Sequence, residues 1–169
     1  QEIEGLMRIR LVTLHPSYVT PNFAAAIADC DKLERALPLP MQSGSDRILK
    51  AMRRGYTTAL YHERVAILRE AVPEIELGSD WIVGFPGETE AEFQETLDVM
   101  EALKFDSAFN FKYSPRRGTK ASEYDDQIDE DIKQDRLERV IELQKKHTLE
   151  RNSQLVGSMQ TVLVEKEAK

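Results

Sequence analysis

Short apolar runs alternate with amphipathic segments along this chain, a pattern typical of proteins built from both strands and helices. Runs rich in β-branched and aromatic residues predict strands at residues 8–13, 37–42, 75–84 and 105–113. The third run has the apolar centre Trp81, Ile82 and Val83, without alternation. Because strands covered on both faces carry such runs, we expect a covered strand of a parallel sheet.

Helices are predicted between these strands by apolar residues three and four positions apart. N-cap signals at Thr20 with Pro21, at Thr57 or Thr58, and at Thr89 with Glu92 predict where three of them begin. Further helices are expected at residues 47–53, with Gly55 as a left-handed end, and at 129–152. The apolar stripe of the last helix is expected to be Ile132, Leu137, Val140, Ile141 and Leu149, with His147 on its polar side.

Repeated strand–helix–strand units with short connections predict an α/β fold with a parallel sheet and right-handed crossovers. Four strands correspond to half of a (β/α) barrel or to most of a small doubly wound sheet. The 169 residues are too few for a complete eight-stranded barrel, which needs about 250. The chain opens with Gln1 and closes on a strand-like run at 161–164, so we expect a segment excised from a longer protein.

Composition narrows the class of protein. Lys and Arg number 23 against 30 Asp and Glu, a net charge of −7, which argues against a freestanding nucleic-acid clamp. No apolar run reaches the roughly 20 residues of a membrane span, so we expect a cytoplasmic protein. The single cysteine, Cys30, excludes a disulfide framework and a cysteine-only metal site, and its place on an apolar helix face predicts a small buried side chain.

Polar residues, glycine and proline gather where the predicted strands end, at residues 13–16, 42–46, 80–88 and 113–119. Ligands of parallel β/α proteins bind at these carboxyl ends. Gln42 and Ser43 could hydrogen-bond a ribose or a carboxylate, or Ser43 or Ser45 could simply cap the next helix. Asp80 could meet an amine or a ribose hydroxyl, or pair with an arginine.

Three further features leave alternatives open. The loop at residues 84–88 could wall a flat ligand with Phe85, or form a rigid turn. The basic residues Arg53, Arg54, Lys112, Arg116, Arg117 and Lys120 could meet phosphate, or form a solvated rim. No metal triad and no nucleophile motif is visible in the sequence.

Several stretches closely resemble the radical S-adenosylmethionine methylthiotransferases, in the family's order. They read LPMQSGSDRILKAMRRGYT at residues 39–57, DWIVGFPGET at 80–89, FDSAF at 105–109 and YSPRRGT at 113–119. The segment at 42–46 is similar to the tRNA-type members. Two departures concern the substrate subtype: residues 36–40 replace a usually histidine-rich stretch, and Arg117 replaces a proline.

The resemblance implies that residues 1–152 form strands three to six of a partial radical SAM (β/α) barrel. Residues 153–169 would be a linker and the first strand of an RNA-binding TRAM β-barrel. The implied cofactors are S-adenosylmethionine and, in the full-length parent, two 4Fe–4S clusters whose cysteines are absent from this chain. The isolated chain is therefore expected to be inactive.

The implied activity is transfer of a methylthio group to C2 of an isopentenyl-modified adenosine beside the anticodon, by radical chemistry. The implied partner is tRNA, bound mainly through the TRAM domain, and exposed sheet edges could also pair copies of the chain. Alternatives are family members that modify a ribosomal protein or threonylcarbamoyladenosine, and a noncatalytic scaffold.

The resemblance also assigns cofactor-binding residues and no catalytic residue. Gln42 resembles the glutamine that approaches the ribose or methionine part of S-adenosylmethionine, with Ser43 beside it. Asp80 resembles the aspartate of the next strand in the same pocket. The adenine would lie against the loop that contains Gly84, Phe85, Pro86 and Glu88. Thr13 and Tyr113 are candidates on the flanking strands.

Overall fold

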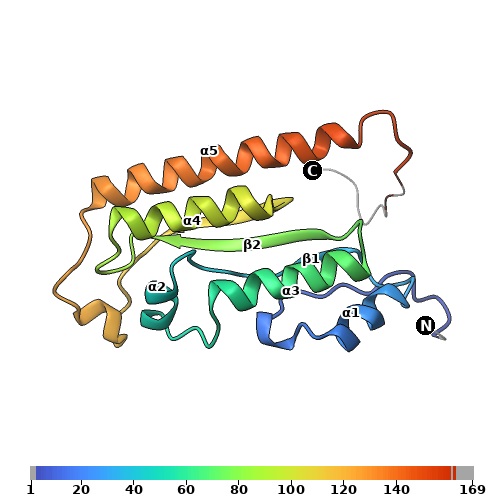
Figure 1. Cartoon of the computed structure of the whole chain (residues 1–169), viewed down its shortest axis with the longest axis horizontal. Coiled ribbons are helices and arrows are strands. Elements are labelled where there is room, and N and C mark those ends of the chain that lie inside the picture. Colours follow the sequence, from blue (N-terminus) through green and yellow to red (C-terminus); the bar gives the residue numbers. More distant parts are fainter. Residues whose placement is uncertain (1–2, 161, 163–169) are drawn as a thin grey trace.

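The computed structural model describes residues 3–160 and residue 162, and its elements are arranged around a parallel sheet (Figure 1). In chain order they are η1 (Pro16–Tyr18), α1 (Pro21–Ala28), β1 (Ala36–Pro38), α2 (Asp46–Ala51), α3 (Thr58–Ala71), β2 (Glu76–Val83), α4 (Glu90–Leu103), β3 (Ser107–Lys112), η2 (Lys120–Glu123) and α5 (Glu130–Gln154). No helix of this described part has the length and apolar character needed to cross a membrane. The predicted α/β class with parallel strands is confirmed.

The three strands lie in the order β1-β2-β3, and both pairs are parallel. Along β2 every second residue from Leu77 to Val83 is buried, and the residues between them are partly exposed. On β3, Phe109 and Phe111 are exposed as well. One face of the sheet is therefore covered and the other is open, so the expectation that β2 is covered on both faces was wrong. A single covered face is the geometry of a barrel half, not of a doubly wound sheet.

The predicted helix starts are confirmed by their caps. The Thr20 hydroxyl accepts a hydrogen bond from the Phe23 N–H at 3.1 Å, and Pro21 occupies the first helical turn, where its missing N–H costs nothing. The Thr57 hydroxyl caps α3. At α4 the side chains of Thr89 and Glu92 cap each other's backbone N–H groups.

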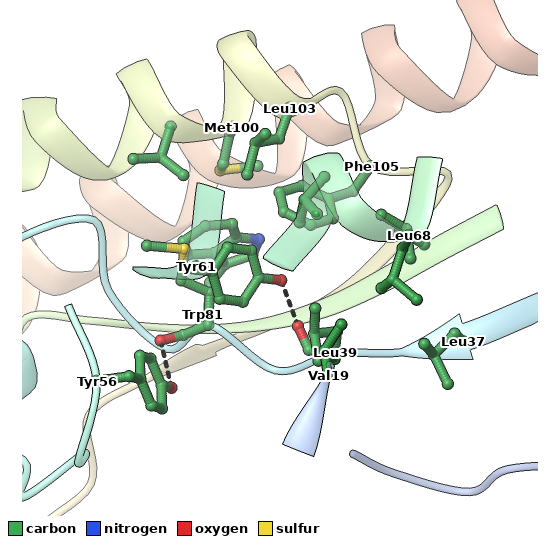
Figure 2. Close-up of a cluster of buried hydrophobic side chains, with 14 of the residues drawn as sticks. Val19, Leu37, Leu39, Tyr56, Tyr61, Leu68, Trp81, Met100, Leu103 and Phe105 are labelled. Atoms are coloured by element: carbon green, nitrogen blue, oxygen red, sulfur yellow. Dashed lines mark hydrogen bonds between the residues drawn. The ribbon is translucent and has the colours of Figure 1, made fainter. Parts of the chain in front are cut away.

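The core lies between the covered face of the sheet and helices α3 and α4, around Trp81 and Phe105 (Figure 2). These rings meet edge to face, with centroids 5.6 Å apart. Two buried tyrosines add hydrogen bonds to the apolar packing: Tyr61 donates to the Leu39 carbonyl, and Tyr56 donates to the Met41 carbonyl at 3.0 Å. Burial raises the pKa of Tyr61, so its hydroxyl remains a donor at every physiological pH. Both bonds hold the backbone just before Gln42.

Regular pairing is shorter than predicted in the first part of the chain. Residues 8–13 form no strand and make a single bridge, between Ile9 and Leu33. The predicted strand at 37–42 is reduced to β1, because Pro38 and Pro40 have no N–H for the ladder. Pairing resumes as one bridge between Gln42 and Trp81.

Two expectations about helix ends were also wrong. Arg53, and not Gly55, takes the left-handed conformation after α2, with φ 59°. α1 ends at Ala28, so Cys30 lies beyond the helix instead of on its apolar face, and it is partly exposed.

The face that the long helix α5 buries matches the predicted stripe only in part: Val140 is fully buried and Leu137 packs against the core. Its buried residues are Lys133, Arg136, Val140, Gln144 and His147. Ile132 is 44% exposed and Leu149 is 69% exposed. His147 is fully buried, and its Nε2 lies 2.6 Å from Glu101 Oε2 on α4, so its expected place on the polar side was wrong. Polar residues can fill this face because α4 and the loop before it supply partners.

The predicted last strand at 161–164, and with it the start of a TRAM barrel, lies outside the described residues apart from Val162. The proposed domain boundary after residue 152 falls inside α5.

Candidate functional site

A cavity of about 840 Å³ opens at the carboxyl ends of the strands. In Figure 1 the arrowhead of β2 points toward this end of the molecule, where α2 and the segment around η2 lie. Gln42, Asp80, Phe85 and Tyr113 line the cavity together, although they come from four segments of the sequence. This volume is in the range of small-molecule and cofactor sites. The expected meeting of Gln42 and Asp80 in one hollow is therefore observed.

Gln42 has an unusual backbone, with φ 76° in the left-handed region. Its N–H donates to the Asp80 carbonyl at 2.8 Å, and its carbonyl accepts from the Ile82 N–H at 2.9 Å. These two bonds hold a conformation that costs a non-glycine residue about 1–3 kcal/mol. Its side-chain amide makes no hydrogen bond within the described part of the chain and faces the cavity, so it is available to a ligand.

Asp80 presents a carboxylate that makes no hydrogen bond or ion pair with other described residues. Burial raises its pKa, and the positive charge of Arg54 opposes that rise. The Arg54 Nε and the Tyr113 hydroxyl, both from cavity-lining residues, are buried atoms without a hydrogen-bond partner among the described residues. Buried polar atoms normally have partners, so this set fits a polar ligand in the cavity.

An aromatic wall closes one side of the cavity. The ring of Phe85 meets Tyr113 edge to face, with centroids 5.1 Å apart, and Tyr124 at 6.5 Å. The Lys133 ammonium lies 5.8 Å from the centre of the Tyr113 ring. Such a wall suits a flat heteroaromatic group.

Glu88 does not line the cavity and instead stabilises the loop that carries Phe85. Its Oε2 accepts from the Gly84 N–H at 2.7 Å and from Arg136 at 2.8 Å. Arg136 also donates to the Glu88 carbonyl at 3.0 Å. Burial raises the pKa of Glu88, and the Gly84 N–H and Arg136 oppose that rise by stabilising the carboxylate. Two features favour glycine at position 84. Its φ is 71°, which is strained for other residues, and an added Cβ would lie 2.4 Å from Lys133 Cγ.

The other predicted residues also lie outside the cavity lining. Pro86 is buried within the same loop. Ser43 is fully buried, and its hydroxyl accepts from the Ser45 N–H at 3.2 Å. Ser45 is the N-cap residue of α2 but makes no capping hydrogen bond with its side chain, so the alternative of side-chain capping is not observed either. Thr13 is exposed and remote from the lining. Of the predicted set, the structure thus brings together Gln42, Asp80, Phe85 and Tyr113.

Five of the six basic residues that the sequence analysis singled out line this same cavity, and Arg117 does not. Its lining includes Arg53, Arg54, Lys112, Arg116 and Lys120, whereas Asp80 is the one acidic residue among the lining residues. The sequence singled these residues out as separate clusters, and no spacing rule could have joined residues 53–54 to residues 112–120. Within the described residues no group of three His, Cys, Asp or Glu side chains could hold a metal ion, so no cluster site is present there.

Comparisons with known proteins identify the superfamily of the chain. The family model described as the radical SAM superfamily matches residues 2–100. A tRNA-2-methylthio-N(6)-dimethylallyladenosine synthase of Moorella thermoacetica is 51% identical over 96% of this chain and 37% of that protein. A synthase of the same name from Pelobacter propionicus is 50% identical over 99% of this chain and 38% of that protein. The chain thus spans less than two fifths of these relatives.

A solved structure shows the same fold. Coproporphyrinogen III oxidase from Escherichia coli, described as a radical SAM enzyme, superposes with a TM-score of 0.68 over 83% of this chain and 32% of that one. The sequence identity is 18%, so this likeness concerns the fold alone.

Proposed function

This chain belongs to the radical SAM superfamily, and we propose from that premise that it forms part of the radical SAM domain of a tRNA methylthiotransferase. The relatives are named as tRNA-modifying synthases, which supports the choice of tRNA, and about half of the residues are identical over nearly the whole chain. The expected product is a methylthio group on C2 of an N6-isopentenyl-type adenosine. Such an activity implies a cytoplasmic protein with tRNA as partner, helped by a TRAM domain.

The proposed role of the cavity is to bind S-adenosylmethionine, which supplies radical chemistry when an iron–sulfur cluster reduces it. The observation that carries this assignment is the pair Gln42 and Asp80: Gln42 pairs with Trp81 next to Asp80 in β2, both line the cavity, and neither side chain has a hydrogen-bond partner among the described residues. The Gln42 amide can both donate to and accept from a ribose or the methionine part. The Asp80 carboxylate can accept from a hydroxyl or an ammonium, and Phe85 with Tyr113 forms the wall for the adenine.

The iron–sulfur clusters need ligands from elsewhere in the full-length protein. Clusters of this kind are held by several cysteine thiolates, and this chain has one cysteine. We therefore assign no cluster ligand to these residues. The contribution of this chain is to bind and orient the cofactor.

The test uses the full-length protein, with its clusters reconstituted under anaerobic conditions, and two readouts. Calorimetry with S-adenosylmethionine should show binding that Gln42→Ala and Asp80→Asn each weaken about tenfold or more, the loss expected for a hydrogen bond to a charged group. Asp131→Asn, an exposed carboxylate on α5, is the matched control and should leave affinity unchanged. Mass spectrometry of tRNA should show the 2-methylthio mark.

Two results would overturn parts of the proposal. Unchanged affinity in both cavity variants would remove the site assignment and favour the scaffold alternative. A methylthiolated ribosomal protein, or marked threonylcarbamoyladenosine, in place of the expected nucleoside would correct the substrate.

A further inference from the structure

The cations of the cavity are in excess over the acids, and most of them lack an acidic partner. Lys112 pairs with Glu130 on α5. Arg53, Arg54, Arg116 and Lys120 have no carboxylate oxygen within 4.0 Å in the part of the chain that the structure describes. This excess occurs in a chain whose net charge is −7.

A second hollow of about 770 Å³ gives an internal comparison. It lies at the amino ends of the strands, and its basic residues are Arg10 and Arg151. Arg10 pairs with Glu34 at 2.8 Å, and Arg151 pairs with Asp106 at 2.7 Å. The two basic residues at the amino ends of the strands are thus paired, whereas four of the five at the carboxyl ends have no carboxylate partner in the described part of the chain.

The backbone conformation of Arg53 also supports a function for its side chain at this cavity. Glycine would take its φ of 59° without strain, and a side chain there costs about 1–3 kcal/mol. Arg53 and Gln42 are two of the three non-glycine residues with positive φ in the described part, and both line this cavity. Backbone strain that is retained at a site supports the hypothesis that the side chains there have a function.

S-adenosylmethionine cannot account for all of this charge. It carries one carboxylate against a sulfonium and an ammonium, so Arg54, which lies beside Asp80, would suffice for its single negative group. The exposed cations Arg53, Arg116 and Lys120 remain without an anion. A ligand with several negative groups in a row would match these three cations.

We infer that Arg53, Arg116 and Lys120, here called the basic rim, bind consecutive phosphates of the substrate RNA around the cavity mouth. This assignment rests on the proposed function and places RNA contact within the radical SAM portion itself, in addition to any TRAM domain. The Phe111 ring, 52% exposed and also in the lining, is positioned to stack on an unpaired base. Single-stranded loops are the RNA form that combines accessible bases with a continuous run of phosphates.

The test measures binding of a fluorescently labelled RNA hairpin, which carries the anticodon loop, to the full-length protein without S-adenosylmethionine. Arg116→Ala and Arg53→Gly should each weaken binding about two- to fivefold at low salt, the range of an exposed charge pair. Each lost phosphate contact should also reduce the slope of log affinity against log salt concentration by about 0.7. Glycine is chosen at position 53 because it accepts the left-handed backbone.

Lys145→Ala is the matched control, since this exposed lysine on α5 lies outside the cavity and has no carboxylate within 4.0 Å among the described residues. It should leave both affinity and slope unchanged. Arg53→Gly should unfold at the same denaturant concentration as the parent or a higher one, which separates lost contact from lost folding.

The inference is overturned if the rim variants behave like Lys145→Ala, or if they impair binding of a polypeptide substrate and leave RNA binding intact. A failure of the proposed function would give a different result from a failure of this inference. Rim-dependent RNA binding with no S-adenosylmethionine binding would remove the cofactor assignment and keep the RNA contact.

Discussion

Removal of the Arg136 guanidinium should unfold this protein more readily than any other single charge change on α5. The Arg136 side chain is 5% exposed and that of Glu88 is 1% exposed, and their closest atoms are 2.8 Å apart. Arg136→Met keeps most of the volume and leaves the Glu88 carboxylate buried with the Gly84 N–H as its remaining donor. Breaking a buried pair in this way costs about 3–5 kcal/mol, a large share of the 5–15 kcal/mol by which a domain is stable.

The stability that Arg136→Met loses should depend on pH, because it depends on the ionisation of Glu88. Burial already raises the pKa of Glu88, and loss of Arg136 raises it further, because the cation favours the charged form. A raised folded-state pKa means that the folded protein holds the proton more tightly than the unfolded chain. The variant therefore loses most stability near neutral pH, where Glu88 is ionised, and recovers part of it as the pH falls through the raised pKa.

Urea denaturation at neutral and mildly acidic pH measures both effects, with Arg139→Met as the matched control. Arg139 lies one turn further along α5 and also stacks on Phe93, but its partner Glu90 is exposed. Its loss should cost about 1 kcal/mol or less. The double variant Glu88→Gln with Arg136→Met should regain stability, since it removes the buried charge. Equal losses for both arginine variants, or a loss independent of pH, would refute this reasoning.

Three further predictions concern the backbone around the site. Gln42→Gly relieves the strain at φ 76°, so the free energy of unfolding of this variant should stay within about 1 kcal/mol of that of the parent. Calorimetry should show weakened S-adenosylmethionine binding, and full affinity would contradict the role of the amide. Gly84→Ala should cost more stability in urea than Gly118→Ala. Both glycines have positive φ, but only the Cβ added at position 84 would contact Lys133, at 2.4 Å. Equal losses would show that the contact is irrelevant. Thr89→Ala removes the capping box of α4 and should cost about 1 kcal/mol in the same assay, and an unchanged midpoint would contradict the cap.

Much of the site was predictable because its motifs are local. The segments at 42–46 and 80–89 led to a family within the radical SAM superfamily, and membership of that superfamily is confirmed by the match over residues 2–100. The rule that ligands bind at carboxyl strand ends led to Gln42 and Asp80, and the structure places both in one cavity. The same rule failed for Thr13, because residues 8–13 form no strand within the described part.

The loop residues show a different limit of prediction. Glu88 was expected at the cofactor because it belongs to the motif, but its carboxylate points to Arg136, nearly fifty positions away in the chain. Only the docking of α5 reveals that partner. The motif residue therefore acts on the shape of the loop, and Phe85 is the part of the loop that lines the cavity.

The sequence alone determined the helix starts, the parallel α/β class and the polar strand ends, because caps and hydrophobic periods depend on residues within a few positions of one another. The tertiary structure decided which face of α5 is buried, that Arg53 and Arg116 line the same cavity, and the left-handed backbone of Gln42. These features depend on contacts between distant segments. A buried polar face such as that of α5 is stable only when remote partners such as Glu88 and Glu101 are in place, and no local pattern records them.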